Sequence, residues 1–378
     1  MLGASLLQSS AIGVLLFFIT FKCYFVDYKL LWKETWKAWG LIAGAIFLSV
    51  LCSELALKSV KGAYDIFRGG LLFFVAASIA LNFEDDVVLS VSKKTFLACT
   101  VAMLISYAVL VFLHDSWWLR DNPILAINLA GIHEYANVVS IILLGLISLW
   151  CVERNNFPVL YMACVLALIT ILLMTNSRGA YLALAVCSLP VLLRFVPSLK
   201  VLCLFFVAGI LLAFYYISFV HTGSDLLGHE IPFSFLERRR LSMGTLEAVL
   251  REPWFGYGFN TYKYIARTLS DGEMFVMPHN IYMGLLFSIG FMGSMSGLAG
   301  LVYFYWRLQP SKAIMLSKVE EFYLLFAQLI LLYLAFRGLT ELKLGFKVWG
   351  SIAIAYGLMA AVNMRIKARN KAIYNNGE

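Results

Sequence analysis

Long apolar stretches follow one another along almost the whole chain, and they limit the fold more than any other feature. Eleven can be drawn, covering residues 3–20, 38–57, 69–83, 95–113, 133–151, 158–175, 180–196, 201–220, 281–306, 321–336 and 348–364. A helix needs ~20 apolar residues to cross a bilayer core. Hydrophobic residues make up 61% of the chain and charged residues 14%, whereas a soluble domain carries about 25% charged residues. The sequence therefore predicts an all-α polytopic membrane protein with about 11–12 transmembrane helices.

The one extended polar segment, residues 221–280, divides the chain into three parts. Residues 1–220 are expected to form transmembrane helices 1–8, and residues 281–378 to form helices 9–11 and a cytoplasmic tail. Within the polar segment, residues 235–252 have an amphipathic pattern. The apolar residues that can share one helical face there are Leu236, Leu241, Met243, Leu246, Val249 and Leu250. We expect a long helical periplasmic loop at the membrane surface, not a separate soluble domain.

Lysine and arginine are unevenly distributed over the connections between the apolar runs. The connections on the side of the C-terminus carry 16 of them, and the short connections on the other side carry 8. Because basic residues are retained on the cytoplasmic side, this bias predicts a cytoplasmic C-terminus and an outward-facing 221–280 loop. The loop itself holds 6 more basic residues, but long loops carry little topological weight. Basic residues in an outward-facing loop run against the tendency of such residues to stay on the cytoplasmic side. The basic cluster of this loop is therefore expected to serve in binding or catalysis.

Arg178, Arg240 and His279 are the candidate site residues on the outer side. Arg178 lies in a short break between two apolar runs, where a charged side chain either has a function or snorkels to the headgroups. Arg240 ends the densest basic cluster, 238–240, and His279 stands where the polar loop enters the run 281–306. Guanidinium groups bind phosphate oxygens bidentately and stay charged when desolvated. Two arginines beside a histidine therefore suggest a pyrophosphate next to a group that accepts a proton.

Three short motifs occur in order between residues 170 and 306. They are Thr175-Asn176-Ser177-Arg178 at a helix break, then Arg240-Leu241-Ser242-Met243 followed by Glu252-Pro253-Trp254-Phe255-Gly256-Tyr257-Gly258, and finally Pro278-His279-Asn280 before a glycine-rich helix. Each motif alone is weakly specific, but the three in this order, with the long loop among them, resemble the O-antigen ligase family of bacterial inner membranes. Many members of that family have twelve spans.

The resemblance implies a metal-independent glycosyltransferase of the GT-C type that needs no cofactor. Such an enzyme moves a glycan from undecaprenyl pyrophosphate to a sugar hydroxyl of lipid A–core, on the periplasmic face of the inner membrane of a Gram-negative bacterium. By this resemblance, Arg178 and Arg240 bind the pyrophosphate, and His279 activates or positions the acceptor hydroxyl. The partners implied are the lipid-linked donor, the lipid A–core acceptor and membrane lipids.

The residue types support this chemistry independently. Fixed cations can neutralise a leaving pyrophosphate, and a histidine with a pKa near ~6.5 is partly neutral at physiological pH. The cysteines show no spacing typical of a metal site, and nothing in the charge pattern indicates nucleic acid. Arg337, Glu341 and Asn280 are weaker candidates for the site. His133, at the start of another apolar run, is assigned to the acceptor or lipid side, outside the site.

Three other functions share some of these features. An O-antigen polymerase has a similar architecture but uses another lipid-linked repeat unit as its acceptor. A protein O-oligosaccharyltransferase usually carries a larger C-terminal region. A transporter of lipid-linked glycans is expected to show inverted repeats and ionisable residues near the middle of the membrane. In this chain, most ionisable residues lie at the ends of the apolar runs.

Overall fold

The computed structural model describes residues 28–53, 55–82, 84–114, 132–153, 159–175, 177–195, 243–259, 261–262, 280–310, 314–339 and 346–375. Its helices are α2 (Tyr28–Leu51), α3 (Ala56–Asn82), α4 (Asp85–His114), α6 (Ile132–Val152), α7 (Val159–Met174), α8 (Arg178–Phe195), α12 (Ile281–Leu308), α13 (Lys318–Gly338) and α14 (Phe346–Asn375). Within these ranges, five helices are long and apolar enough to cross a membrane, namely α3, α4, α6, α12 and α13, and α7 is a shorter apolar helix. The predicted all-α polytopic membrane fold is confirmed.

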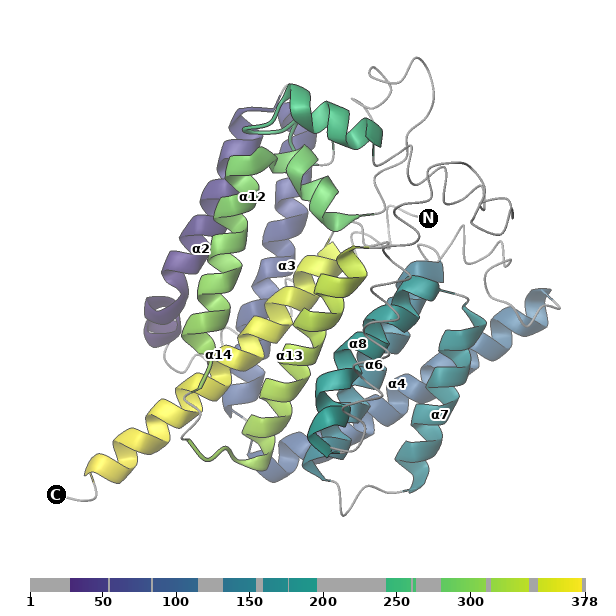
Figure 1. Ribbon diagram of the computed structural model, residues 1–378. Coiled ribbons are helices and arrows are strands. Elements are labelled where there is room, and N and C mark those ends of the chain that lie inside the picture. The colour runs from purple at the N-terminus through teal and green to yellow at the C-terminus, as the bar shows by residue number, and fades with distance from the viewer. Residues whose placement is uncertain are drawn as a thin grey trace.

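The helices form two groups joined by α13 and α14 (Figure 1). In one group α2 packs on α12, and α14 packs along α3; in the other, α4, α6, α7 and α8 pack together. α13 lies between the groups and contacts α14 on one side and α6 and α8 on the other. Small residues permit the closest approaches, as is usual between membrane helices. At Gly357 of α14, for example, a Cβ atom would lie 2.4 Å from the backbone oxygen of Phe73 in α3.

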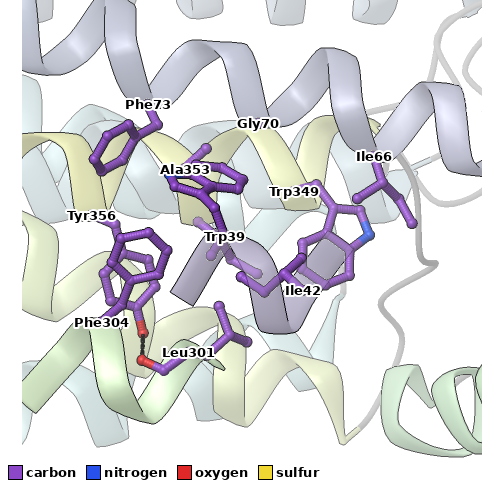
Figure 2. Close-up of a pocket in the computed structure, with 11 residues that line it drawn as sticks. Trp39, Ile42, Ile66, Gly70, Phe73, Leu301, Phe304, Trp349, Ala353 and Tyr356 are labelled. Atoms are coloured by element: carbon purple, nitrogen blue, oxygen red, sulfur yellow. Dashed lines mark hydrogen bonds between the residues drawn. The ribbon is translucent and has the colours of Figure 1, made fainter. Parts of the chain in front are cut away.

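An apolar hollow of about 360 Å³, open mouth included, lies among α2, α3, α12 and α14. Figure 2 shows its lining, in which the aromatic rings of Trp39, Phe73, Phe304 and Tyr356 stand close to one another. The Tyr356 hydroxyl donates a hydrogen bond of 2.8 Å to the backbone oxygen of Leu301. The hollow is therefore a gap in an aromatic core.

The two ends of the bundle differ in chemistry. At one end, basic residues of the last turns of α14 pair with carboxylates at the starts of other helices. Lys367 lies 2.8 Å from Glu34 of α2, Arg369 lies 3.1 Å from Glu320 of α13, and Arg365 pairs with Asp85 of α4. The opposite end holds the starts of α3, α6, α8, α12 and α14 and the ends of α2, α7 and α13.

Helix boundaries differ from the predicted ones where charged residues begin a helix. The stretches 58–68 and 84–94 were expected to be connections, but they are the first turns of α3 and α4. A helix that projects beyond the apolar core can carry charged residues at its ends, so an apolar run underestimates its length. The runs 133–151, 158–175 and 281–306 match α6, α7 and the described part of α12 to within two residues at each end.

Of the amphipathic stretch of the long loop, the structure describes a helix over residues 243–251. Val249 is buried in the protein, whereas Met243, Leu246 and Leu250 are exposed. Thr245 and Ala248 are buried in their place, against Tyr262 and Tyr257. The helix thus has one face packed on the protein and a separate apolar face that remains open.

Candidate functional site

Three of the predicted site residues belong to the part of the chain that the structure describes. Arg178 is the first residue of α8, and its backbone alone is described. Asn280 precedes α12, and Arg337 lies in the last turn of α13. Arg240, His279 and Glu341 lie outside the described residues, so their roles remain predictions.

The chain between α7 and α8 makes a tight turn that is fixed by its own side chains. Thr175 and Ser177 are both buried, and the hydroxyl of Thr175 accepts a hydrogen bond of 3.3 Å from the backbone nitrogen of Ser177. The backbone oxygen of Ser177 accepts bonds from Ala180 and Tyr181, which start α8. Thr175 therefore lies at the end of α7 and Ser177 at the start of α8, with Arg178 directly after the buried Ser177.

Arg337 connects this turn to α6. It is fully buried, with 0% of its surface exposed. Its Nε donates to the amide oxygen of Asn137 at 3.0 Å, and its terminal nitrogen Nη2 donates to the Ser177 hydroxyl at 3.1 Å. The hydroxyl of Tyr333, one turn earlier in α13, donates to the same Asn137 oxygen at 2.8 Å. One guanidinium thus holds α6 and the α7–α8 turn against the end of α13.

Asn280 attaches the start of α12 to the same end of α13. Its side-chain oxygen caps the helix by accepting hydrogen bonds from the backbone nitrogens of Tyr282 and Met283, at 2.9 and 3.2 Å. Its side-chain nitrogen reaches the backbone oxygen of Leu339 at 3.4 Å. The Tyr282 hydroxyl also donates to the backbone oxygen of Ala335 at 2.8 Å. Leu339 is two residues from Arg337, so Asn280 and Ser177 are both held within one turn of α13.

His133, which the sequence assigned to a place outside the site, also contacts this cluster. Its Nδ1 atom lies 3.4 Å from the Ser177 hydroxyl, which Arg337 also contacts. His133 and Asn137 are one turn apart at the start of α6 and so lie on one helix face. Sequence reasoning missed this contact because nothing in the sequence pairs the start of α6 with the α7–α8 turn.

The electrostatic character of this end follows from helix direction. α6, α8 and α12 all begin here, and helix N-termini carry partial positive charge. Arg337 adds a full charge in their midst. Among the described residues, no three His, Cys, Asp or Glu side chains are grouped so that they could hold a metal ion. The helix starts and the buried Arg337 are positive, and Glu134 in the first turn of α6 is negative.

A comparison with known proteins finds a family match for part of the chain. The model of the O-antigen ligase family, Wzy_C, matches residues 162–298, from within α7 to within α12. The matched segment includes Arg178, Arg240 and His279. Enzymes of this family transfer lipid-linked glycans. No curated protein matches the chain. Residues 162–298 of this multi-pass membrane protein belong to the O-antigen ligase family.

Proposed function

We propose that this protein is an O-antigen ligase, which transfers a glycan from undecaprenyl pyrophosphate to a sugar hydroxyl of lipid A–core. The observation that carries the proposal is the meeting of Ser177 and Asn280 at the last turn of α13. Arg178 follows Ser177 and His279 precedes Asn280, and neighbouring Cα atoms are ~3.8 Å apart. The contacts that hold Ser177 and Asn280 thus support a single site that contains Arg178 and His279.

In this site the arginines and the histidine have separate tasks. Arg178 and Arg240 bind the pyrophosphate oxygens and neutralise the charge that develops when the bond from the anomeric carbon to the pyrophosphate breaks. His279 accepts the proton of the acceptor hydroxyl as its oxygen bonds to the anomeric carbon. The products are the new glycosidic bond, undecaprenyl pyrophosphate and a protonated histidine. No step in this scheme requires a metal ion.

The direction of the site follows from the distribution of charge. The paired basic residues of α14 lie at the end of the bundle opposite Arg337. Basic residues are retained in the cytoplasm, which supports a periplasmic position for the cluster around Arg337. Lipid A–core and the lipid-linked donor would meet there.

Lipopolysaccharide profiling of a deletion strain tests the function. A ligase deletion removes all polymer from lipid A–core, while lipid-linked polymer accumulates. A core capped with a single repeat unit would identify a polymerase instead. Loss of periplasmic lipid-linked donor, with the purified protein inactive in transfer, would identify a transporter. The purified protein should form the polymer–core product from lipid-linked donor and lipid A–core alone.

A further inference from the structure

The loop at 253–258 crosses α12 where this helix is interrupted. Gly290 has φ 62° and ψ −172°, so α12 consists of a first limb, 281–289, and a second limb, 291–308, set at an angle to it (Figure 1). A break of this kind leaves backbone groups without their partners in the helix. An unpaired backbone group costs several kcal/mol in the membrane interior. The break therefore needs partners from elsewhere in the chain.

The loop supplies these partners with its own backbone. The nitrogens of Tyr257 and Gly258 donate to the oxygens of Phe287 and Ser288, at 2.9 and 2.8 Å. In return, the nitrogens of Phe291 and Met292 donate to the oxygens of Pro253 and Trp254, at 2.7 and 3.1 Å. Two bonds thus serve the end of the first limb and two serve the start of the second.

Two glycines make this crossing possible. A Cβ at Gly290 would lie 2.4 Å from the backbone carbonyl atoms of Trp254, and a Cβ at Gly256 would lie 2.6 Å from the nitrogen of Gly290. Both residues also have positive φ, 62° and 66°, which side chains disfavour. Neither clash can be relieved by moving a flexible side chain, because the opposing atoms are backbone. The pair is therefore specific for glycine.

The crossing is fixed to the helices behind it. The hydroxyl of Ser53, between α2 and α3, donates to the oxygen of Tyr257 at 2.7 Å, and the hydroxyl of Ser49 donates to the oxygen of Ser288 at 2.9 Å. Ser59 of α3 accepts from the nitrogen of Phe259 at 3.0 Å. These buried serines bond both the loop and α12 to the segment formed by α2 and α3, so this segment sets the direction of the first limb.

The first limb ends at the candidate site. Ile281 lies so close to Gly338 of α13 that a Cβ at Gly338 would be 2.4 Å from the Ile281 Cγ2 atom. Asn280 caps the limb and contacts Leu339. A straight α12 would carry Asn280 and Ile281 along the axis of the second limb, away from α13. The bend at Gly290 is what returns them to the end of α13.

We propose that Gly290 and Gly256 are positioning residues for glycan transfer: their crossing aims the first limb of α12 so that His279 reaches the pyrophosphate site beside Arg337. This proposal rests on the proposed function for the role of His279. Neither glycine contacts the substrate. Their loss should reduce turnover and leave the apparent KM for the lipid-linked donor unchanged, because the arginines hold the donor.

A disulfide reports the position of the limb without any substrate. A Cβ atom at residue 338 would lie 3.6 Å from the Cβ of Ile281, within the range of about 3.5–4.5 Å that disulfides need. In a background without the seven native cysteines, the pair Ile281→Cys and Gly338→Cys should form a disulfide on mild oxidation. Gly290→Ala should abolish that disulfide. In an otherwise unaltered chain, it should also lower turnover at least tenfold at normal membrane abundance.

Gly297→Ala, in the same helix, is the matched control, because a Cβ atom at this position would meet no atom within 4 Å. It should keep both the disulfide and the transfer rate. Should Gly290→Ala fail to accumulate, Ser49→Ala removes the bond to the oxygen of Ser288 in the first limb. It should then lower disulfide yield and turnover together, by roughly threefold to tenfold, as expected for loss of one hydrogen bond.

The outcomes separate the two proposals. Loss of both disulfide and turnover in the Gly290 variant supports the positioning role. A full disulfide yield in that variant overturns it, whatever the activity. If the unaltered protein transfers no glycan while the Gly290 variant still loses the disulfide, the proposed function fails. That result would still show that the position of the first limb depends on Gly290. It would exclude a positioning role in glycan transfer.

Discussion

Arg337 is a guanidinium buried among helices, and its hydrogen bonds carry structural weight. Replacement by methionine keeps much of the volume but removes the bonds to Asn137 and Ser177. Removing one partner of a buried charged network typically costs ~3–5 kcal/mol. Arg337→Met should therefore unfold at a clearly lower temperature in detergent. The exposed Arg251 is the control, and Arg251→Ala should leave the midpoint unchanged. Equal midpoints for both variants would contradict the structural role.

The two arginines of the proposed pyrophosphate site permit a test of whether transfer depends on the planar shape of the guanidinium group or only on its charge. Arg178→Lys and Arg240→Lys keep the charge but lose the planar fork that binds phosphate bidentately. Both should lose most transfer activity, measured with purified enzyme, at normal membrane abundance. Arg239→Ala should have a mild effect, since it belongs to the expected basic face. Near-normal activity in both lysine variants would show that these arginines act only as surface charges and do not bind pyrophosphate bidentately.

His279 is the residue on which the proposed mechanism depends. If it is a general base, His279→Ala should lower turnover by roughly 10²–10⁴-fold while donor binding persists. His279→Gln can donate a hydrogen bond to the hydroxyl but cannot take its proton, so it should be nearly as inactive. Recovery of much of the rate by glutamine would show that the histidine only positions the acceptor. A purified alanine variant with full turnover would exclude both roles.

Among the elements, α14 holds together, through its last turns, the helix ends at the side of the bundle that is proposed to be cytoplasmic. The carboxylate of Glu34 in α2 forms ion pairs with Lys367 (Oε1 to Nζ, 2.8 Å) and with Arg307 (Oε2 to Nη2, 2.7 Å). Burial alone would raise the pKa of Glu34, but the hydrogen bond and charge of Lys367, with Arg307, lower it below the ordinary value of 4.5. Because the folded-state pKa is the lower one, the stabilisation is present above pH 4.5 and is lost as the pH falls through the folded value.

Thermal unfolding of the detergent-solubilised protein between about pH 3 and pH 7 measures this contribution to stability. Wild type should lose stability toward acid more steeply than Glu34→Gln, which has no charge to titrate at this position. Glu247→Gln, an exposed carboxylate on the 243–251 helix, should follow the wild-type curve. Identical slopes for wild type and Glu34→Gln would show that the α14 pairing contributes nothing to stability.

The sequence predicted those elements whose limits are set by the membrane. α6 and α7 end where their apolar runs end, because neither helix has a long polar extension. The break in α12 was not predicted, since Gly290 stands in a glycine-rich run. Only its contact with Gly256, distant in the chain, distinguishes it from Gly297. Of the residues that meet at the end of α13, Arg337 and Asn280 were predicted as weak site candidates, whereas the contact of His133 with Ser177 was missed because it depends on helix packing.

At the scale of the whole molecule, the orientation in the membrane can be measured directly. In a cysteine-free background, Ser224→Cys and Gly272→Cys should react with a membrane-impermeant maleimide in cells with a permeabilised outer membrane. Asn376→Cys should react only after the inner membrane is opened. The reason is the excess of basic residues on the side of the C-terminus. Protection at position 224 with labelling at position 376 would reverse the proposed direction of the site.

The packing of α14 along α3 has a consequence for biogenesis. α3 is among the first described helices to leave the ribosome, and its partner α14 is the last. At about 5–20 residues per second, synthesis of the intervening chain takes on the order of tens of seconds. During that time, the face of α3 that receives Gly357 and its neighbours has only lipid, α2 or a membrane chaperone to cover it. Nascent chains halted before Phe346 should therefore be the form that membrane quality-control proteases degrade, and release of α14 should end that exposure.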